Sequence, residues 1–156
     1  MARRPRIISE PRAQDGSGGV ESLVVKNSTA PRKILIVDDQ PTVRKALRTV
    51  LQHQGYGVFE AADADQALSL TVIHKPDLIV LDIMLPGKSG LQVSAAIKSK
   101  AEYKGIPIVL LSAGRSGVDS QEWKAQSFAD AFLAKPCKAR DILAVIERFL
   151  GAPAKK

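Results

Sequence analysis

The sequence predicts an α/β protein with one parallel, doubly wound sheet of five strands and five helices, and three observations lead to this class. Short apolar runs alternate along the chain with longer segments whose apolar residues recur at helical spacing. Several of the runs are continuous and rich in Ile, Val and Leu, which is typical of strands buried on both faces of a parallel sheet. Right-handed crossovers leave few topologies for such a chain, and the strand order 2-1-3-4-5 is the natural one.

The first two strands and helices follow from residue 33, where the composition changes. Residues 34–37 predict a buried strand, and Pro41 suits the first turn of a helix that ends before Gly55. Residues 57–61 predict a short second strand. The next helix is expected to bury one apolar face, formed by Ala64, Ala67, Leu68 and Val72.

The rest of the chain continues this alternation of strands and helices. In chain order we expect a strand at 77–81, a helix at 91–100, a strand at 106–111, a helix at about 119–128 and a strand at 131–133. The apolar stripe of a last helix is formed by Ile142, Val145, Ile146, Phe149 and Leu150. Five strands alternating with five helices correspond to the flavodoxin-like arrangement.

The length of 156 residues predicts one domain, which we place at residues 31–151. Residues 1–30 are rich in Arg, Pro, Gly and Ser and are expected to be a disordered basic tail, and 152–156 a short C-terminal tail. No apolar run approaches the roughly 18–20 residues that a membrane span needs, so we expect no membrane partner. Cys137 is the one cysteine, which excludes an internal disulfide, and we expect a cytoplasmic location.

The net charge of +7 lies largely at the two ends of the chain. Residues 1–30 carry five basic and three acidic side chains, and Lys155 and Lys156 add two positive charges. A basic tail can bind nucleic acid. The tail, however, has no interleaved aromatic residues and no helix-turn-helix pattern. A nucleic-acid-associated regulator therefore stays an alternative, and we do not expect nucleic acid as the partner.

Ligands of doubly wound sheets bind beyond the carboxyl ends of the strands, so the residues after each predicted strand are candidate site residues. Asp38 and Asp39 follow the first strand, and Asp82 follows the third. Ser112 follows the fourth strand and Lys135 the fifth. The topology therefore brings three carboxylates, a hydroxyl and an ammonium to one edge of the sheet.

Three carboxylates in one place repel one another, and a hard divalent cation such as Mg²⁺ would relieve that repulsion. An ammonium and a hydroxyl beside them suit a site for phosphoryl transfer, in which one carboxylate is the nucleophile and forms an aspartyl-phosphate. Simpler interpretations stay open at this point. Asp38 and Asp39 could cap the following helix, and Ser112 could be a turn residue.

Five short motifs in order resemble the receiver domain of two-component response regulators, over residues 33–150. They are Ile-Leu-Ile-Val-Asp38-Asp39, Asp77-Leu-Ile-Val-Leu-Asp82-Ile-Met-Leu-Pro86, Gly90, Leu-Leu-Ser112-Ala113 and Lys135-Pro136. The resemblance implies a stand-alone, chemotaxis-regulator-like response regulator, which is a phosphorylation-switched signalling module and not an enzyme. It also implies that a histidine kinase or a histidine phosphotransfer protein is the phosphoryl donor.

The resemblance also implies a role for each candidate residue. Asp82 matches the phospho-acceptor, and Asp38 and Asp39 match the acidic pair that holds Mg²⁺ together with Asp82, with Asp39 the expected direct ligand. Met84 matches the residue whose backbone carbonyl completes the coordination. The phosphoryl-binding and switch residues of the family are matched by Ser112, Lys135 and Phe132.

The chain departs from the common family pattern near its output region. Phe132 replaces a frequent Tyr, Phe128 stands where many relatives have a helix-stopping Gly, Cys137 replaces a frequent Phe, and residues 114–120 look loose. The output partner is therefore unknown, and we expect a monomer or a weak phosphorylation-dependent dimer. Output would be by protein contact or by passing the phosphoryl group on.

Two other function classes are compatible with the fold. An aspartate-nucleophile phosphohydrolase typically has an Asp-x-Asp pair after the first strand, whereas here the two acids are adjacent and the nucleophile candidate follows the third strand. A flavin-binding module would need a Ser/Thr/Gly-rich phosphate loop after the first strand, and residues 38–41 have the opposite charge. The phosphohydrolase is the alternative that the sequence favours more.

Overall fold

Five parallel strands form one sheet in the computed structural model, which describes residues 30–112 and 126–151 of the chain. The strands are β1 (Lys33–Val37), β2 (Gly57–Ala61), β3 (Leu78–Asp82), β4 (Ile108–Ser112) and β5 (Ala131–Ala134). Their order in the sheet is β2-β1-β3-β4-β5, so the predicted topology is confirmed. Four consecutive residues of each central strand, 34–37 in β1 and 78–81 in β3, are apolar and fully buried, as a sheet covered on both faces requires.

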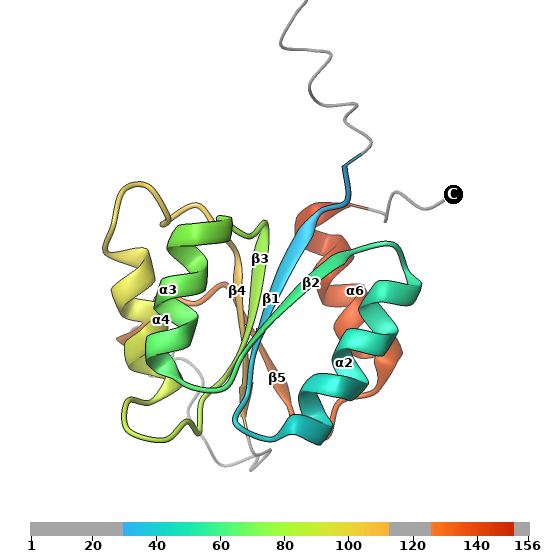
Figure 1. Cartoon of the computed structure of the whole chain (residues 1–156), viewed down its shortest axis with the longest axis horizontal. Coiled ribbons are helices and arrows are strands. Elements are labelled where there is room, and N and C mark those ends of the chain that lie inside the picture. Colours follow the sequence, from blue (N-terminus) through green and yellow to red (C-terminus); the bar gives the residue numbers. More distant parts are fainter. Residues whose placement is uncertain (1–29, 113–125, 152–156) are drawn as a thin grey trace, which may run out of the picture. The chain divides into compact units, whose positions relative to one another are not determined.

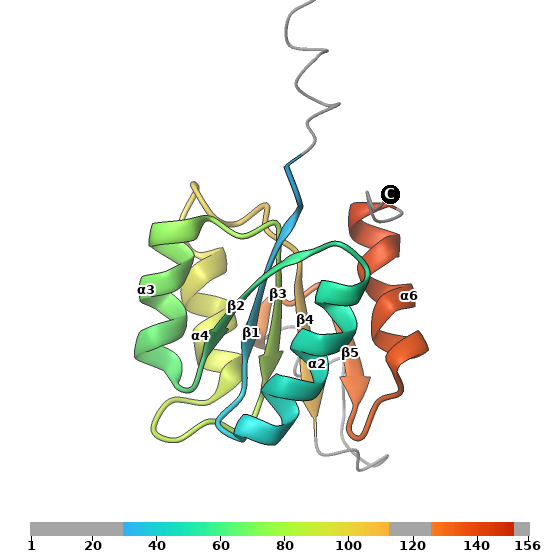
Figure 2. The same cartoon turned by 45° about the vertical axis from the view of Figure 1, so that its right-hand side comes forward.

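Helices cover both faces of this sheet. They are α2 (Pro41–His53), α3 (Ala64–His74), α4 (Gly90–Lys98) and α6 (Ala139–Leu150). Figures 1 and 2 show α2 and α6 side by side on one face, and α3 and α4 on the other. The part of the chain that the structure describes thus contains four of the five predicted helices. The remaining one, expected at about 119–128, lies mostly outside the described residues.

Alternate residues of each strand point into two separate apolar cores. Leu35, Val37, Ile79 and Leu81 belong to the core under α3 and α4. Ile34, Ile36, Leu78 and Val80 belong to the core under α2 and α6. Full burial of a Leu, Ile or Val side chain contributes about 1.5–3 kcal/mol, so these two strands supply much of the stability of the sheet.

The predicted inner face of α3 is wrong at one position. Val72 is 54% exposed, while Thr71 is buried beside Ala67. With 3.6 residues per turn, residue 71 continues the stripe of Ala64 and Ala67 more closely than residue 72 does. The hydroxyl of Thr71 donates a hydrogen bond of 2.8 Å to the carbonyl of Ala67, and this bond makes its burial possible.

Two strand boundaries also differ from the prediction. The strand expected at 77–81 is Leu78–Asp82, and the strand expected at 106–111 is Ile108–Ser112. Asp82 and Ser112 are therefore the last residues of their strands and not the first residues of the following loops. Backbone pairing places Asp82 beside Leu111 and Ser112 beside Ala134, so both side chains are positioned by the rigid sheet.

No helix in the two described stretches is long and apolar enough to cross a membrane.

Candidate metal centre

The carboxyl ends of four strands bring most of the predicted site residues together. Asp38 and Asp39 follow β1, Asp82 ends β3, Ser112 ends β4 and Lys135 follows β5. One carboxylate oxygen from each of the three aspartates lies within 4.8 Å of the others. Oxygen ligands at this spacing fit a small divalent cation.

Asp38 is completely buried and is held from several directions. Its backbone N–H donates to the carbonyl of Ala61, at 3.1 Å, which ties it to the end of β2. Its Oδ1 accepts a hydrogen bond of 2.9 Å from the backbone N–H of Gln40, and its Oδ2 accepts one of 3.0 Å from Nζ of Lys135. These bonds make the buried charge tolerable and leave its carboxylate little freedom to rotate.

Asp82 is also buried, with 2% of its surface exposed. Its Oδ1 accepts a hydrogen bond of 3.1 Å from the backbone N–H of Met84, and its Oδ2 lies 3.3 Å from Nζ of Lys135. Burial raises the pKa of Asp82 above its ordinary value, and the negative charge of Asp38 adds to this effect. The N–H of Met84 and the ammonium of Lys135 lower the pKa but do not cancel the increase.

Lys135 neutralises part of this acidic cluster. Its partial burial lowers its pKa, but the hydrogen bond to Asp38 and the charges of Asp82 and Asp38 raise it more, so the net shift is upward. The side chain therefore remains an ammonium at neutral pH. Its backbone N–H donates to the carbonyl of Ser112, at 2.7 Å, and the Lys135–Pro136 peptide bond is cis.

Asp39 and Met84 lie on the open side of the site. Both residues are exposed, and Met84 has 68% of its surface accessible. A pocket of about 410 Å³ opens there, lined by Asp39, Gln40, Asp82, Met84, Leu85, Pro86 and Lys135. This space is wide enough for an ion, its waters and a phosphoryl group.

Ser112 and Phe132 lie on the neighbouring strands β4 and β5. Ser112 is half-buried at the end of β4. Phe132 pairs with Leu110, which precedes Ser112 by two residues, and it packs against the apolar core under α3 and α4. Ser112 thus ends β4 at the carboxyl edge of the sheet, and Phe132 lies two register positions further from that edge on β5.

The helix that follows Asp82 begins very close to it. A Cβ atom at Gly90 would lie 2.2 Å from the carbonyl oxygen of Asp82. The N–H of Gly90 donates to the carbonyl of Ile83, at 2.7 Å, and the side chain of Ser89 caps the helix at the N–H of Gln92. Gly90 is therefore required because of this close approach.

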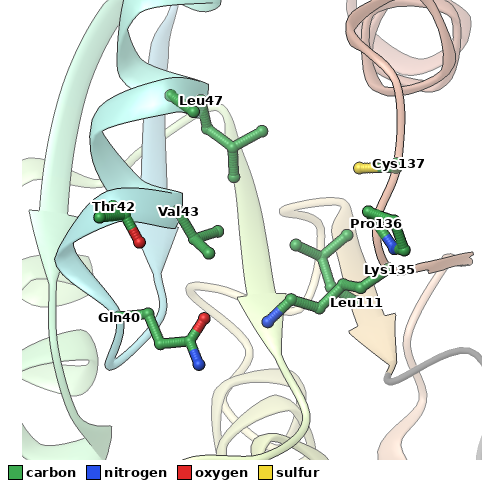
Figure 3. A pocket seen from close by; sticks show the side chains of 9 residues that line it. Gln40, Thr42, Val43, Leu47, Leu111, Lys135, Pro136 and Cys137 are labelled. Atoms are coloured by element: carbon green, nitrogen blue, oxygen red, sulfur yellow. The ribbon is translucent and has the colours of Figure 1, made fainter.

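A second hollow adjoins the site between α2 and the connection from β5 to α6. It has a volume of about 550 Å³, and Figure 3 shows Lys135 extending across it toward the start of α2. Val43, Leu47 and Pro136 give it apolar walls, and Cys137 lies at its edge. Burial raises the pKa of the Cys137 thiol, so the thiol is not activated as a nucleophile.

Arg44 is a neighbour of the site that the sequence analysis missed. Its Nη1 donates a hydrogen bond of 2.6 Å to the carbonyl of Asp38. A basic residue one turn into the helix after an acidic pair is a signal in the sequence. A lone arginine at this place is more often a surface residue, so the contact of Arg44 with Asp38 could be identified only from the structure.

Comparisons with known proteins agree with this geometry. Residues 34–147 match the response regulator receiver domain family. The chain is 35% identical over 119 residues to the phosphate regulon transcriptional regulatory protein PhoB of Pseudomonas aeruginosa, an alignment that covers 76% of this chain and 52% of PhoB. The chain thus spans about half the length of that curated relative.

Two solved structures show the same fold over most of this chain. The chemotaxis protein CheY4 of Vibrio cholerae is 29% identical, with a TM-score of 0.72 and coverage of 77% of this chain and 99% of CheY4. The receiver domain of the sensor histidine kinase PA1611 of Pseudomonas aeruginosa is 28% identical, with a TM-score of 0.71 and coverage of 79% and 100%. In that structure a magnesium ion is coordinated in the active site cleft. From its sequence match and its fold, the chain belongs to the response-regulator receiver domain family of two-component signalling.

Proposed function

We propose that the domain at residues 31–151 accepts one phosphoryl group on Asp82 in a magnesium-dependent reaction. The observation that carries the proposal is the arrangement of Asp38, Asp39 and Asp82 within 4.8 Å of one another, with Lys135 bonded to two of them. Three carboxylates this close together, two of them buried, need cations, and one lysine neutralises only part of their charge.

The residues present fit a magnesium ion. Asp39 and Asp82 are the proposed direct carboxylate ligands, the backbone carbonyl of Met84 the third protein ligand, and Asp38 the acid that completes the charge balance. Asp39 and Met84 lie on the open side, where water can fill the remaining positions that Mg²⁺ usually keeps hydrated. When bound, the ion supplies positive charge that offsets the oxygens of the phosphoryl group.

The proposed reaction is a displacement at phosphorus. An oxygen of the Asp82 carboxylate forms a bond to phosphorus, the bond from phosphorus to the donor breaks, and the donor leaves with that bond's electron pair. The donor is a phosphohistidine of a histidine kinase or of a phosphotransfer protein, whose imidazole is a good leaving group when it takes up a proton. The residues of this chain orient the acceptor and neutralise charge, which is how such sites accelerate phosphoryl transfer.

Lys135 and Ser112 are the proposed contacts of the bound phosphoryl group. The ammonium of Lys135 already lies 3.3 Å from Oδ2 of Asp82, so it can bond a phosphoryl oxygen with a small movement. The Ser112 hydroxyl can donate from the end of β4. If Ser112 moves inward, the half-buried Phe132 behind it gains space, and this pair is the proposed switch.

Output through a protein partner or through onward phosphoryl transfer is part of the same proposal. A cytoplasmic location is also part of the proposal, because histidine kinases present their phosphohistidine there. We also propose a monomer or a weak phosphorylation-dependent dimer.

Intact mass spectrometry tests the acceptor assignment. The chain is incubated with acetyl phosphate and Mg²⁺, and we expect the mass of one phosphoryl group to be added. Asp82→Asn is expected to abolish the addition, while Asp65→Asn, which removes an exposed carboxylate at the start of α3, should leave it intact. Undiminished labelling of Asp82→Asn would reject the proposal.

A further inference from the structure

We propose that Arg44 is a positioning residue that fixes the peptide between Asp38 and Asp39, and through it the Asp39 carboxylate, for binding of the divalent cation. This inference rests on the proposed magnesium site. Nothing in the family match assigns this role to Arg44, which does not line the pocket that contains Asp39 and Asp82.

Arg44 connects three elements of the fold. It lies in the first turn of α2, and its Nη1 donates to the backbone carbonyl of Asp38 at 2.6 Å. Its Nε donates to Oε1 of Glu60, on β2, at 3.1 Å. The Arg44 side chain is 17% exposed and that of Glu60 25%, so the pair is shielded and geometrically defined. The guanidinium therefore holds the loop after β1 against β2.

The two aspartates of the acidic pair are held in different ways. The Asp38 carboxylate is bonded by Gln40 and Lys135, so its position does not depend on one contact. Asp39 is exposed, and among the described residues its carboxylate has no hydrogen bond or ion pair. The point from which its side chain starts is therefore set by its backbone alone.

The backbone of Asp39 begins at the peptide bond whose carbonyl Arg44 holds. Without the guanidinium, the Asp38–Asp39 peptide plane can rotate, and a carbonyl oxygen on this plane can turn toward water. Such a rotation moves the Cα atom and the carboxylate of Asp39 relative to Asp82. Groups that orient a metal ligand in this way typically change metal affinity by about tenfold or more.

Removal of Arg44 should change the Mg²⁺ affinity in opposite directions through its charge and through its positioning contact. A guanidinium repels a divalent cation, so its removal by charge alone would strengthen Mg²⁺ binding. A loss of positioning would weaken binding. Whether Mg²⁺ binding becomes stronger or weaker therefore shows which effect dominates, the lost repulsion or the lost positioning.

Arg48 is the matched control. It lies one turn later on α2 and pairs with the same Glu60, through Nη1 and Oε2. It has no hydrogen bond to Asp38 in the described part of the chain. Arg48→Ala thus removes the same charge and one contact of Glu60, but leaves the contact to the peptide intact.

The experiment measures Mg²⁺ dissociation constants of the full chain by calorimetry for the parent, Arg44→Ala, Arg44→Lys, Arg48→Ala and Asp39→Ala. We expect Arg44→Ala to weaken binding about tenfold and Arg48→Ala to leave it unchanged. Arg44→Lys keeps the charge and one donor, so we expect binding between that of the parent and that of Arg44→Ala. In the magnesium-free protein, the amide NMR signal of Asp39 should shift in Arg44→Lys and not in Arg48→Ala.

Equal or tighter binding in Arg44→Ala would overturn the inference, and so would equal weakening in Arg44→Ala and Arg48→Ala. If Arg44→Ala does not fold, Arg44→Lys decides, and an unshifted Asp39 amide with parent-like affinity rejects the inference. A parent that binds no Mg²⁺, or binding that Asp39→Ala does not weaken, would instead overturn the proposed metal site and the inference with it. If the parent binds Mg²⁺ and the Arg44 variants bind it equally well, only the proposed role of Arg44 is rejected.

Discussion

Nζ of Lys135 lies 3.3 Å from Oδ2 of Asp82, although the two residues are 53 positions apart in the chain. The same ammonium lies 3.0 Å from Oδ2 of Asp38, so one cation is shared between two buried carboxylates. A divalent cation that enters the site therefore meets a cluster that is already partly neutralised. Lys135 therefore both stabilises the carboxylates in magnesium-free protein and competes with the ion for them.

Lys135→Ala is expected to change stability and metal affinity in opposite directions. In magnesium-free buffer the variant leaves two buried carboxylates without their cation, and we expect a loss of about 3 kcal/mol in the free energy of unfolding. Mg²⁺ should bind more tightly, because the competing charge is gone. Urea unfolding with and without Mg²⁺ checks both effects. Weaker Mg²⁺ binding in this variant would contradict the competition.

Gly90→Ala is expected to destabilise the fold because its Cβ would lie 2.2 Å from the carbonyl oxygen of Asp82 and 2.8 Å from Cα of Ile83. Both neighbours are backbone atoms that cannot rotate away. We expect a loss of roughly 3 kcal/mol in unfolding free energy. Gly105→Ala is the control, since a Cβ there meets nothing within 4 Å, and it should change stability by less than about 0.5 kcal/mol. Equal stability of the two variants would show that α4 shifts freely.

Tyr56→Phe is expected to stabilise the protein at neutral pH by about 1 kcal/mol. The Tyr56 hydroxyl is buried and has no hydrogen-bond partner among the described residues. Loss of this hydroxyl removes a desolvated polar group while the ring stays packed between the sheet and α6. Chemical denaturation at neutral pH measures the difference. A destabilised Phe variant would mean that the hydroxyl is satisfied in solution.

The same residue should make stability depend on pH in the alkaline range. Burial and the charge of Glu147 raise the pKa of Tyr56 above its ordinary value of 10.0, against a smaller opposing effect of Arg32. The folded state therefore holds the phenol proton more tightly than the unfolded state. The resulting stability is present below pH 10 and is lost as the pH rises through the folded pKa. Tyr56→Phe should lose less stability than the parent over this range.

Deletion of residues 1–30 is expected to leave phosphoryl labelling unchanged. The candidate site is built from residues between Asp38 and Lys135, and β1 begins at Lys33, whose backbone N–H is bonded to Oδ2 of Asp77 at 2.7 Å. Intact mass after treatment with acetyl phosphate measures the result. Loss of folding or of labelling would show that the segment contributes to the domain.

The topology of the sheet and the residues at its edge were predictable because they depend on hydrophobic periodicity and on strand order. The unequal burial of the acidic pair was not. Asp38 is fully buried and Asp39 is exposed, yet the two are adjacent and chemically identical. The difference arises from hydrogen bonds to Gln40 and Lys135, which depend on backbone geometry and on a residue 97 positions away.

The helix-stop position at Phe128 shows a similar limit. The sequence has Phe where many relatives have a helix-stopping Gly. The structure gives Phe128 a positive φ of 59° and 62% exposure. A bulky residue in this conformation is uncommon, and the flanking Ser127 helps to hold it, because its carbonyl accepts a hydrogen bond of 2.8 Å from Ser94 on α4. Tertiary contacts therefore hold Phe128 in a backbone conformation that a bulky residue does not favour by itself.

The bond from the Gly90 N–H to the carbonyl of Ile83 joins the two ends of the loop that follows β3. The loop is thus a closed ring, with its ends clamped by backbone contacts and its tip, Pro86–Lys88, exposed to solvent. Exposed loop tips of this kind tolerate substitution well. Lys88, which is exposed and does not line the pocket at Asp82, is therefore a suitable place to attach a fluorescent or spin label near the site. Such a label would report on the site without displacing it.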